Sequence, residues 1–195
     1  MTRGLLIVDV QNDFTEGGAL GVDGGAAIAS GVTSLLQASA GTYALVMASR
    51  DWHAQTGDNG GHFATMSDPD YVTSWPVHCV EGTPGAAYHP ALAVDAIDVN
   101  VKKGHGEPAY SLFEGLTDDG RTPADALRTA GIDEVDVVGI ATDHCVRATA
   151  LDAVHGGLRV RVLSDLVAGV SPEASATALD ELRAAGVRVE PSDPA

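Results

Sequence analysis

The segment GLLIVDV, residues Gly4 to Val10, is a nearly continuous apolar run rich in β-branched side chains. Such a run predicts a β-strand that is buried on both faces, because a half-exposed strand would alternate apolar and polar residues. Five further short runs are candidate strands, and they are Tyr43–Ala48, Val99–Val101, Val135–Ile140, Val160–Leu163 and Val187–Val189. The sequence therefore predicts a central sheet of six strands.

Most of these runs are separated by stretches with the spacing of helices, namely Ala26–Ala40, Pro123–Ala130, Cys145–Val154 and Pro172–Ala185. Thr122 and Ser171 each precede a proline, which suits a side-chain cap followed by the first helical turn. Strands that alternate with helices indicate a parallel sheet covered on both faces. We expect an α/β protein with three α-β-α layers around a mostly parallel sheet, built as one domain over residues 1–190. Residues 191–195 are expected to form a short flexible tail.

The composition excludes several kinds of partner. The 195 residues include 27 acidic and 11 basic side chains, which give a formal net charge of −16. Nucleic acids and anionic membrane surfaces bind clusters of lysine and arginine, so this acidity argues against both. The longest apolar runs fall far short of the roughly 18 residues that cross a bilayer, and no apolar signal segment is visible, so a cytoplasmic location is expected. Two cysteines in dissimilar surroundings do not suggest a disulfide framework.

Polar residues follow the predicted strands at the points where they end. Asp9 ends the first strand, Asp51 follows the second, Lys103 follows the third and Cys145 follows the fourth. The carboxyl ends of parallel strands share one edge of the sheet, where functional residues of such folds collect. These four side chains are therefore expected to meet at one edge.

Cys145 opens a helical stretch, and this position suggests a nucleophile. The positive end of a helix dipole favours the thiolate, and the free N–H groups of a first turn can receive an oxyanion. Asp9 could serve as the base, and Lys103 could supply positive charge. Two alternatives stay open on these residues alone: Cys145 as a small packed core residue, and Asp9 with Lys103 as surface charges or a structural ion pair.

The long segment from Arg50 to Leu92 lacks regular periodicity and holds four of the seven histidines. Asp51 and His53 are two residues apart, so an extended backbone projects both to one side. His62 and His78 can return to the same place from the loop, and such a ligand set suits Zn, Fe or Mn. Cys79 would point away from His78 and is interpreted as structural. No partners are evident for His89, His105 and His155.

Phe14, Trp75 and Tyr110 are aromatic residues in predicted loops of a chain that is only 5% aromatic. Flat rings that line a pocket would suit a flat aromatic substrate. The alternative, that each ring belongs to the core, is equally compatible with the sequence.

Six ordered motifs carry a resemblance to a known family: LLIVDVQNDF (Leu5–Phe14), SRDWH (Ser49–His53), SWPVHCVEGTPGA (Ser74–Ala86), KKG (Lys102–Gly104), YSLFEG (Tyr110–Gly115) and GIATDHCVRATALDA (Gly139–Ala153). Together they resemble the nicotinamidase/pyrazinamidase branch of the isochorismatase-like cysteine hydrolases. The resemblance runs from about Gly4 to Val189 and implies the isochorismatase-like hydrolase fold. It also implies hydrolysis of nicotinamide to nicotinate and ammonia in NAD salvage, and hydrolysis of pyrazinamide.

The resemblance assigns roles to residues of this chain. It implies a catalytic triad of Asp9, Lys103 and Cys145, with an oxyanion hole formed by the backbone N–H groups of Ala141 and Cys145. It further implies an unusual cis peptide between Ile140 and Ala141. A non-proline cis bond costs roughly 3 kcal/mol, so it persists only where the surrounding structure requires it.

The resemblance also implies a metal site and a pocket. One divalent ion, Fe, Mn or Zn, would be bound by Asp51, His53 and His78, with His62 as the fourth ligand. The stretch AQTGDNGG between His53 and His62 is longer than in the branch that the chain resembles. The substrate pocket would be lined by Phe14, Trp75, Tyr110 and His144.

Two other functions remain as alternatives. The first is a cysteine amidohydrolase of the same fold that acts on another small, carbamoyl-type amide. The second is a non-catalytic metal- or ligand-binding protein, although such a protein would be expected to have lost triad members. The sequence is compatible with a monomer or a small homo-oligomer.

Overall fold

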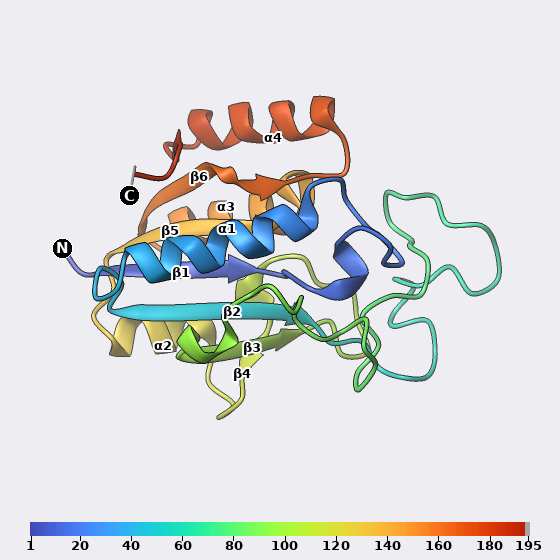
Figure 1. The fold of residues 1–195 in the computed structure, drawn as a ribbon. Helices are drawn as coiled ribbons and strands as arrows, with labels where there is room; N and C mark the ends of the chain where they lie inside the picture. The colour runs from blue at the N-terminus through green and yellow to red at the C-terminus, as the bar shows by residue number, and fades with distance from the viewer. Residues whose placement is uncertain (194–195) are drawn as a thin grey trace.

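The computed structural model describes residues 1–193 and is built around one sheet (Figure 1). The strand order is β4-β3-β2-β1-β5-β6-β7, and every neighbouring pair is parallel except β3 with β4. The strands are β1 (Arg3–Val8), β2 (Leu45–Asp51), β3 (Val99–Lys103), β4 (Leu116–Thr117), β5 (Glu134–Ile140), β6 (Arg159–Ala168) and β7 (Arg188–Glu190). The predicted mostly parallel sheet is confirmed.

The predicted number of six strands is wrong, because the sheet has seven strands within residues 1–193. The additional strand, β4, contains only two residues and pairs antiparallel with the outer edge of β3. A strand of two residues has no periodicity that a sequence pattern could reveal. The predicted tail at 191–195 stays a prediction, and its last two residues lie outside the described residues.

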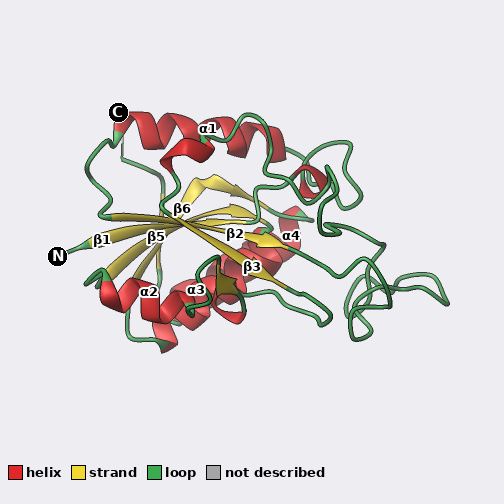
Figure 2. Cartoon of the chain, turned by 90° about the horizontal axis from the view of Figure 1, so that it is seen from below, coloured by secondary structure: helices red, strands yellow, loops and turns green. Residues whose placement is uncertain are grey.

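Helices cover both faces of the sheet (Figure 2), as the three-layer prediction requires. They are α1 (Gly25–Ala38), α2 (Pro123–Thr129), α3 (Arg147–His155) and α4 (Pro172–Ala184). Side chains of α1 pack with Leu5 and Ile7 on one face, whereas α2, α3 and α4 pack with Leu6 and Val8 on the other. Thr122 and Ser171 cap α2 and α4 as predicted, each by accepting a hydrogen bond from a first-turn N–H. None of the helices within residues 1–193 is long and apolar enough to span a membrane.

The helix around Cys145 differs from the prediction. Its first turn, Thr142–Val146, is π-helical and leads directly into α3. Cys145 therefore lies within that turn instead of opening the helix. The predicted cis peptide between Ile140 and Ala141 is present immediately before it.

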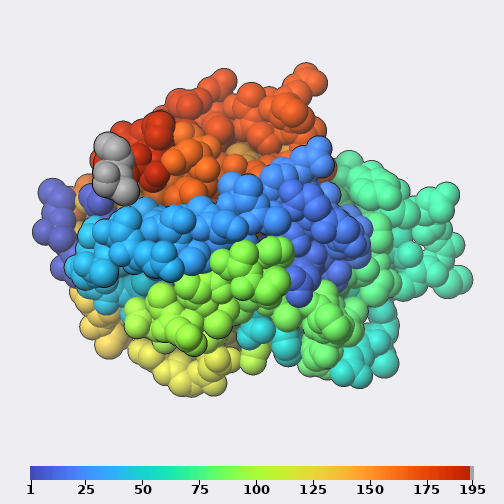
Figure 3. Space-filling model, viewed as in Figure 1, coloured from blue at the N-terminus to red at the C-terminus, as the bar shows by residue number. Residues whose placement is uncertain are grey.

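The segment between β2 and β3 is irregular apart from one short turn of 3-10 helix at Val94–Ala96. It leaves the carboxyl end of β2 and extends beyond the sheet (Figure 1), and the part drawn in teal projects from the body of the molecule (Figure 3). Isolated bridges tie it together, between His53 and Val80 and between Phe63 and Trp75. This segment forms one wall of the site described next.

Candidate active site

The carboxyl ends of four neighbouring strands bring together the polar residues that the sequence analysis placed there. Asp9 follows β1 directly, Asp51 ends β2, Lys103 ends β3, and Cys145 follows β5 by one turn. All four are buried, and the lysine is among the largest buried side chains of the protein. Their expected meeting at one edge is confirmed by the contacts of Lys103.

Lys103 is the centre of this cluster. Its Nζ lies 2.9 Å from Asp9 Oδ2 and 3.7 Å from Cys145 Sγ, and it donates a hydrogen bond to Asp51 Oδ1. Burial by itself lowers the pKa of Lys103, but the carboxylates of Asp51 and Asp9 outweigh it and hold that pKa well above its usual value. The ammonium therefore stays charged and balances two buried carboxylates.

Asp9 is arranged to accept a proton. Burial raises the pKa of its carboxyl, against the opposing effect of Lys103, and Ser49 Oγ donates to Oδ1 at 2.7 Å. The sequence analysis did not single out Ser49. It lies two residues before Asp51 on β2, so the alternation of a strand places both side chains on one face.

The thiol of Cys145 differs from the expectation of a helix-stabilised thiolate. Burial raises the pKa of Cys145 well above its usual value; Lys103 opposes this shift, while Asp9 and Asp51 add to it. The loss of hydration on burial outweighs the stabilisation of the thiolate by the positive charge of Lys103. The resting thiol is protonated, so it needs a base to become a nucleophile, and Asp9 is that neighbour.

Asp51 connects this cluster to the histidines. Its Oδ1 faces Lys103, and its Oδ2 lies 3.5 Å from His53 Nε2 and 3.7 Å from His78 Nε2. Burial alone would raise the pKa of Asp51, but Lys103 and the adjacent rings of His53 and His78 lower it well below its usual value. The Asp51 carboxylate is therefore ionised, and it faces Lys103 with one oxygen and the histidines with the other.

Gln11 is a second residue that the sequence analysis missed. Its buried amide accepts from the Asp51 N–H at 2.8 Å and donates to the Asp51 carbonyl at 2.9 Å. The side chain thus pairs with the backbone at the end of β2, beyond the last residue of β1. Neither its residue type nor its spacing in the sequence indicated this pairing.

The three histidines form a buried cluster. Ring nitrogens of His53, His62 and His78 lie within 4.8 Å of one another. Nδ1 of His53 donates to the Gly104 carbonyl and Nδ1 of His78 donates to the Pro76 carbonyl, each at 2.7 Å. These bonds leave Nε2 of both rings as lone-pair donors that point into the cluster.

The cluster fits a divalent metal ion. Among the described residues, His53 Nε2 and both ring nitrogens of His62 are buried without a hydrogen-bond partner. Burial, aided by the neighbouring histidines, lowers the pKa of His62 to about 3, so its ring is neutral. Imidazole nitrogens beside an ionised carboxylate suit Zn, Fe or Mn.

The longer stretch before His62 does not keep that residue from the cluster. Asn59 closes the loop by accepting from the Ala54 N–H at 2.8 Å and donating to the Ala54 carbonyl at 3.2 Å. The Phe63 bridge to Trp75 then holds the following residues. His105 lies outside the site and faces Glu81 at 3.4 Å on the surface.

Replacing His62 with alanine is expected to weaken Zn²⁺ binding by more than about 100-fold, because even loss of an outer partner of a metal ligand costs about 10–100-fold. His105→Ala is the matched control, since its side chain is 62% exposed. Competition titration of Zn²⁺ against a chelator measures both variants. Equal affinities in the two would remove His62 from the ligand set.

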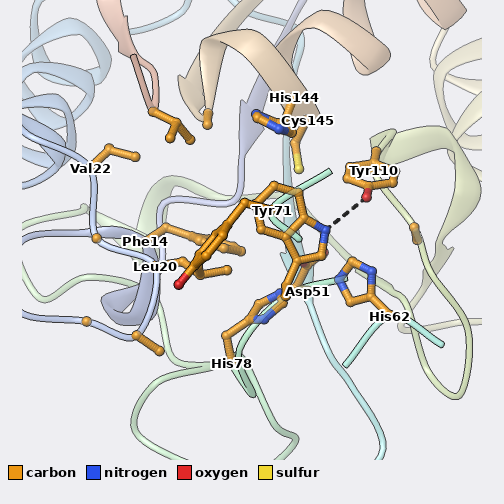
Figure 4. Close-up of a pocket in the computed structure, with 17 residues that line it drawn as sticks. Phe14, Leu20, Val22, Asp51, His62, Tyr71, His78, Tyr110, His144 and Cys145 are labelled. Carbon is orange, nitrogen blue, oxygen red and sulfur yellow. Dashed lines mark hydrogen bonds and ion pairs between the residues drawn. The ribbon is translucent and has the colours of Figure 1, made fainter. Parts of the chain in front are cut away.

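Cys145, His62 and His78 face a cavity of about 480 Å³ (Figure 4). The four predicted pocket residues all line it, namely Phe14, Trp75, Tyr110 and His144, and so does Ala141. Trp75 Nε1 donates to the Tyr110 hydroxyl at 3.0 Å, and the Trp75 and His144 rings lie 5.2 Å apart. The sequence analysis missed further lining residues, which include Leu20, Val22, Tyr71 and Val170.

Comparisons with known proteins agree with this geometry. The isochorismatase domain matches residues 3–193 of the chain. A nicotinamidase/pyrazinamidase of Mycobacterium tuberculosis is 54% identical over 187 residues, which cover 96% of this chain and 97% of that protein. A nicotinamidase of Escherichia coli is 38% identical, covering 94% of this chain and 92% of that protein.

A solved structure is similar to this chain in both fold and sequence. The crystal structure of a Pyrococcus horikoshii pyrazinamidase in complex with zinc has a TM-score of 0.83 and 38% identity, covering 98% of this chain and all of that one. The sheet order, the buried site and these similarities lead to one assignment. The chain belongs to the isochorismatase family.

Proposed function

We propose that the protein hydrolyses nicotinamide to nicotinate and ammonia, and pyrazinamide to the corresponding acid. The observation that carries this proposal is the buried group of Asp9, Lys103 and Cys145 beside the histidine cluster, with Cys145, His62 and His78 lining one aromatic-lined cavity. The identity of 54% to a nicotinamidase/pyrazinamidase supports the same substrate. A structure 36% identical to this chain, from L. infantum, is in complex with nicotinate.

In the first half of the reaction Asp9 takes the proton of the Cys145 thiol. The thiolate attacks the amide carbonyl, and the new carbon–sulfur bond gives a tetrahedral oxyanion. Protonated Asp9 then passes its proton to the amide nitrogen as the carbon–nitrogen bond breaks, so ammonia leaves and a thioester remains. The raised pKa of Asp9 suits this exchange, because it makes the carboxylate a stronger base than an exposed one.

In the second half Asp9 deprotonates a water molecule, which attacks the thioester carbonyl. The carbon–sulfur bond breaks, nicotinate forms, and the proton returns to the Cys145 sulfur. The backbone N–H groups of Ala141 and Cys145 donate to the oxyanion in both halves. Lys103 stays protonated throughout and keeps the carboxylate of Asp9 in place.

Asp51, His53, His62 and His78 would hold a divalent metal ion. When bound, the ion supplies a coordination position for the ring nitrogen of the substrate and so orients the ring. The substrate ring would be enclosed within the cavity by Phe14, Trp75, Tyr110 and His144. The donor set does not choose among Fe, Mn and Zn, since availability decides within such a group.

Ammonia release from nicotinamide by the purified protein tests this proposal, before metal removal, after it, and after addition of Mn²⁺, Fe²⁺ or Zn²⁺. Turnover is expected to disappear on removal and to return with metal. Turnover that is indifferent to metal removal, with faster release from a carbamoyl compound, would indicate the alternative amidohydrolase. A single burst of ammonia without turnover would indicate a binding protein.

A further inference from the structure

The cavity is larger than one substituted ring requires, and its lining has a polar part and an apolar part. Clefts of roughly 300–1,000 Å³ take drug-sized ligands, so about 480 Å³ leaves space beside a single ring. Asp51, His62, His78 and Cys145 supply the polar and reactive lining. The remaining lining includes an apolar group formed by Leu20, Val22, Tyr71 and Val170, which we term the outer wall. Figure 4 shows Leu20 and Val22 on the side of the cavity away from His62 and Tyr110.

The proposed function fixes how a ring would face the outer wall. The ring nitrogen lies toward the histidines and the carbonyl carbon lies at Cys145, so both anchors belong to one edge of the ring. In nicotinamide, carbon 5 is the ring atom that points directly away from that edge. A substituent there would leave the reactive part of the cavity and extend into the space beside it.

We propose that the outer wall is a subsite for a compact apolar substituent, so that the enzyme also hydrolyses nicotinamides alkylated at carbon 5. This inference rests on the proposed function. The residues of the wall have apolar side chains, apart from the hydroxyl of Tyr71. A charged substituent would lose its hydration there without gaining a partner, whereas an alkyl group would bury its own surface and that of the wall.

Backbone hydrogen bonds hold the wall in place without a ligand. The Leu20 N–H donates to the Asp13 carbonyl at 2.8 Å, and the Val22 N–H donates to the Phe14 carbonyl at 3.1 Å. The Val170 N–H donates to Asp143 Oδ1 at 3.1 Å. A wall that is ordered in advance costs less to occupy than one that must form on binding.

Tyr71 belongs to a turn that is closed around Asp70. The Asp70 Oδ1 atom accepts from the N–H groups of Val72, Thr73 and Ser74 at 2.8–2.9 Å. Tyr71 and Val170 are 58% and 59% exposed, so they keep apolar surface that a substituent could cover. The wall thus combines a fixed backbone with uncovered side chains.

The test compares nicotinamide, 5-propylnicotinamide and 6-propylnicotinamide as substrates of the metal-loaded enzyme. We expect 5-propylnicotinamide to be hydrolysed with kcat within about tenfold of nicotinamide and with a lower KM, by up to about fourfold for each methylene that is buried. The 6-propyl isomer is expected to be inert, because its substituent adjoins the ring nitrogen and meets the histidines. Hydrolysis of nicotinamide without hydrolysis of the 5-propyl compound would overturn the subsite.

Val170→Trp provides the matched variant, because it fills the wall from an exposed position outside the reactive group. It is expected to lower the ratio of kcat/KM for 5-propylnicotinamide to kcat/KM for nicotinamide by more than tenfold. An equal effect on both substrates would assign Val170 a general structural role and overturn the subsite. Failure of the wild-type enzyme to hydrolyse nicotinamide itself would instead reject the proposed function, and the subsite with it.

Discussion

Replacing Cys145 with alanine is expected to lower the rate of ammonia release from nicotinamide by a factor on the order of 10⁴ or more, as removal of a nucleophile does in other hydrolases. The reason is that the Sγ atom forms the bond on which both halves of the reaction depend. The residues that line the cavity remain in place, so nicotinamide should still bind. Ammonia release and calorimetric titration measure the two properties on the same preparation.

Cys79→Ala is the control for loss of a buried thiol. Cys79 is also buried, but its backbone N–H donates to Asp13 Oδ2 at 2.7 Å, and alanine keeps that bond. We expect this variant to retain activity within about tenfold, since only the packing of the small sulfur and its 4.0 Å contact with the Gly85 carbonyl change. Activity of Cys145→Ala comparable with that of Cys79→Ala would reject the covalent mechanism.

Replacing Lys103 with methionine is expected to abolish activity and to lower the free energy of unfolding by about 3–5 kcal/mol at pH 7, the usual cost of leaving a buried charge without its partner. Asp9 and Asp51 both lose their shared ammonium. Lys102→Met is a control from the adjacent position. The Lys102 side chain is 40% exposed and pairs with the exposed Asp118, so we expect a change of about 0–1 kcal/mol. Urea denaturation measures both variants.

Near the carboxyl pKa, the contribution of Asp51 to stability should have opposite signs in the two proteins. In the wild type the pKa of Asp51 lies below its unfolded value of about 4, so its stabilising contribution is present above that pH and is lost as pH falls through the folded pKa. Without Lys103, burial raises the folded pKa values of Asp9 and Asp51, so the variant becomes less stable as pH rises through them. The difference in unfolding free energy should therefore shrink on acidification. A difference independent of pH would show that the lysine does not act through these carboxylates.

Most of the architecture could be predicted from the sequence. The apolar runs give the six longer strands, the capped helical stretches give α2 and α4, and the polar residues at strand ends lie together as expected. Each of these signals is local, because a buried strand and a capped helix each impose a short repeating pattern. The edge strand β4 was not predicted because its two residues carry no such pattern.

Within the site, too, some features could be predicted from the sequence and others could not. Asp9, Asp51, Lys103 and Cys145 could be named from their places after strands, since the topology of a parallel sheet brings those ends together. The sequence could not reveal that Lys103 bridges two carboxylates or that Gln11 pairs with the backbone of Asp51. These contacts join residues 40 or more positions apart, and distances of about 3 Å depend on the packing of all the elements between them.

By itself the sequence determined the order of the elements, the edge that carries the site and the side chains available there. Only the tertiary structure decided their charges: a protonated thiol at Cys145, an ionised carboxylate at Asp51 and a neutral ring at His62. A helix dipole suggests a thiolate, whereas burial among carboxylates raises the thiol pKa. Protonation follows hydration and the nearest charges, and both are properties of the folded chain.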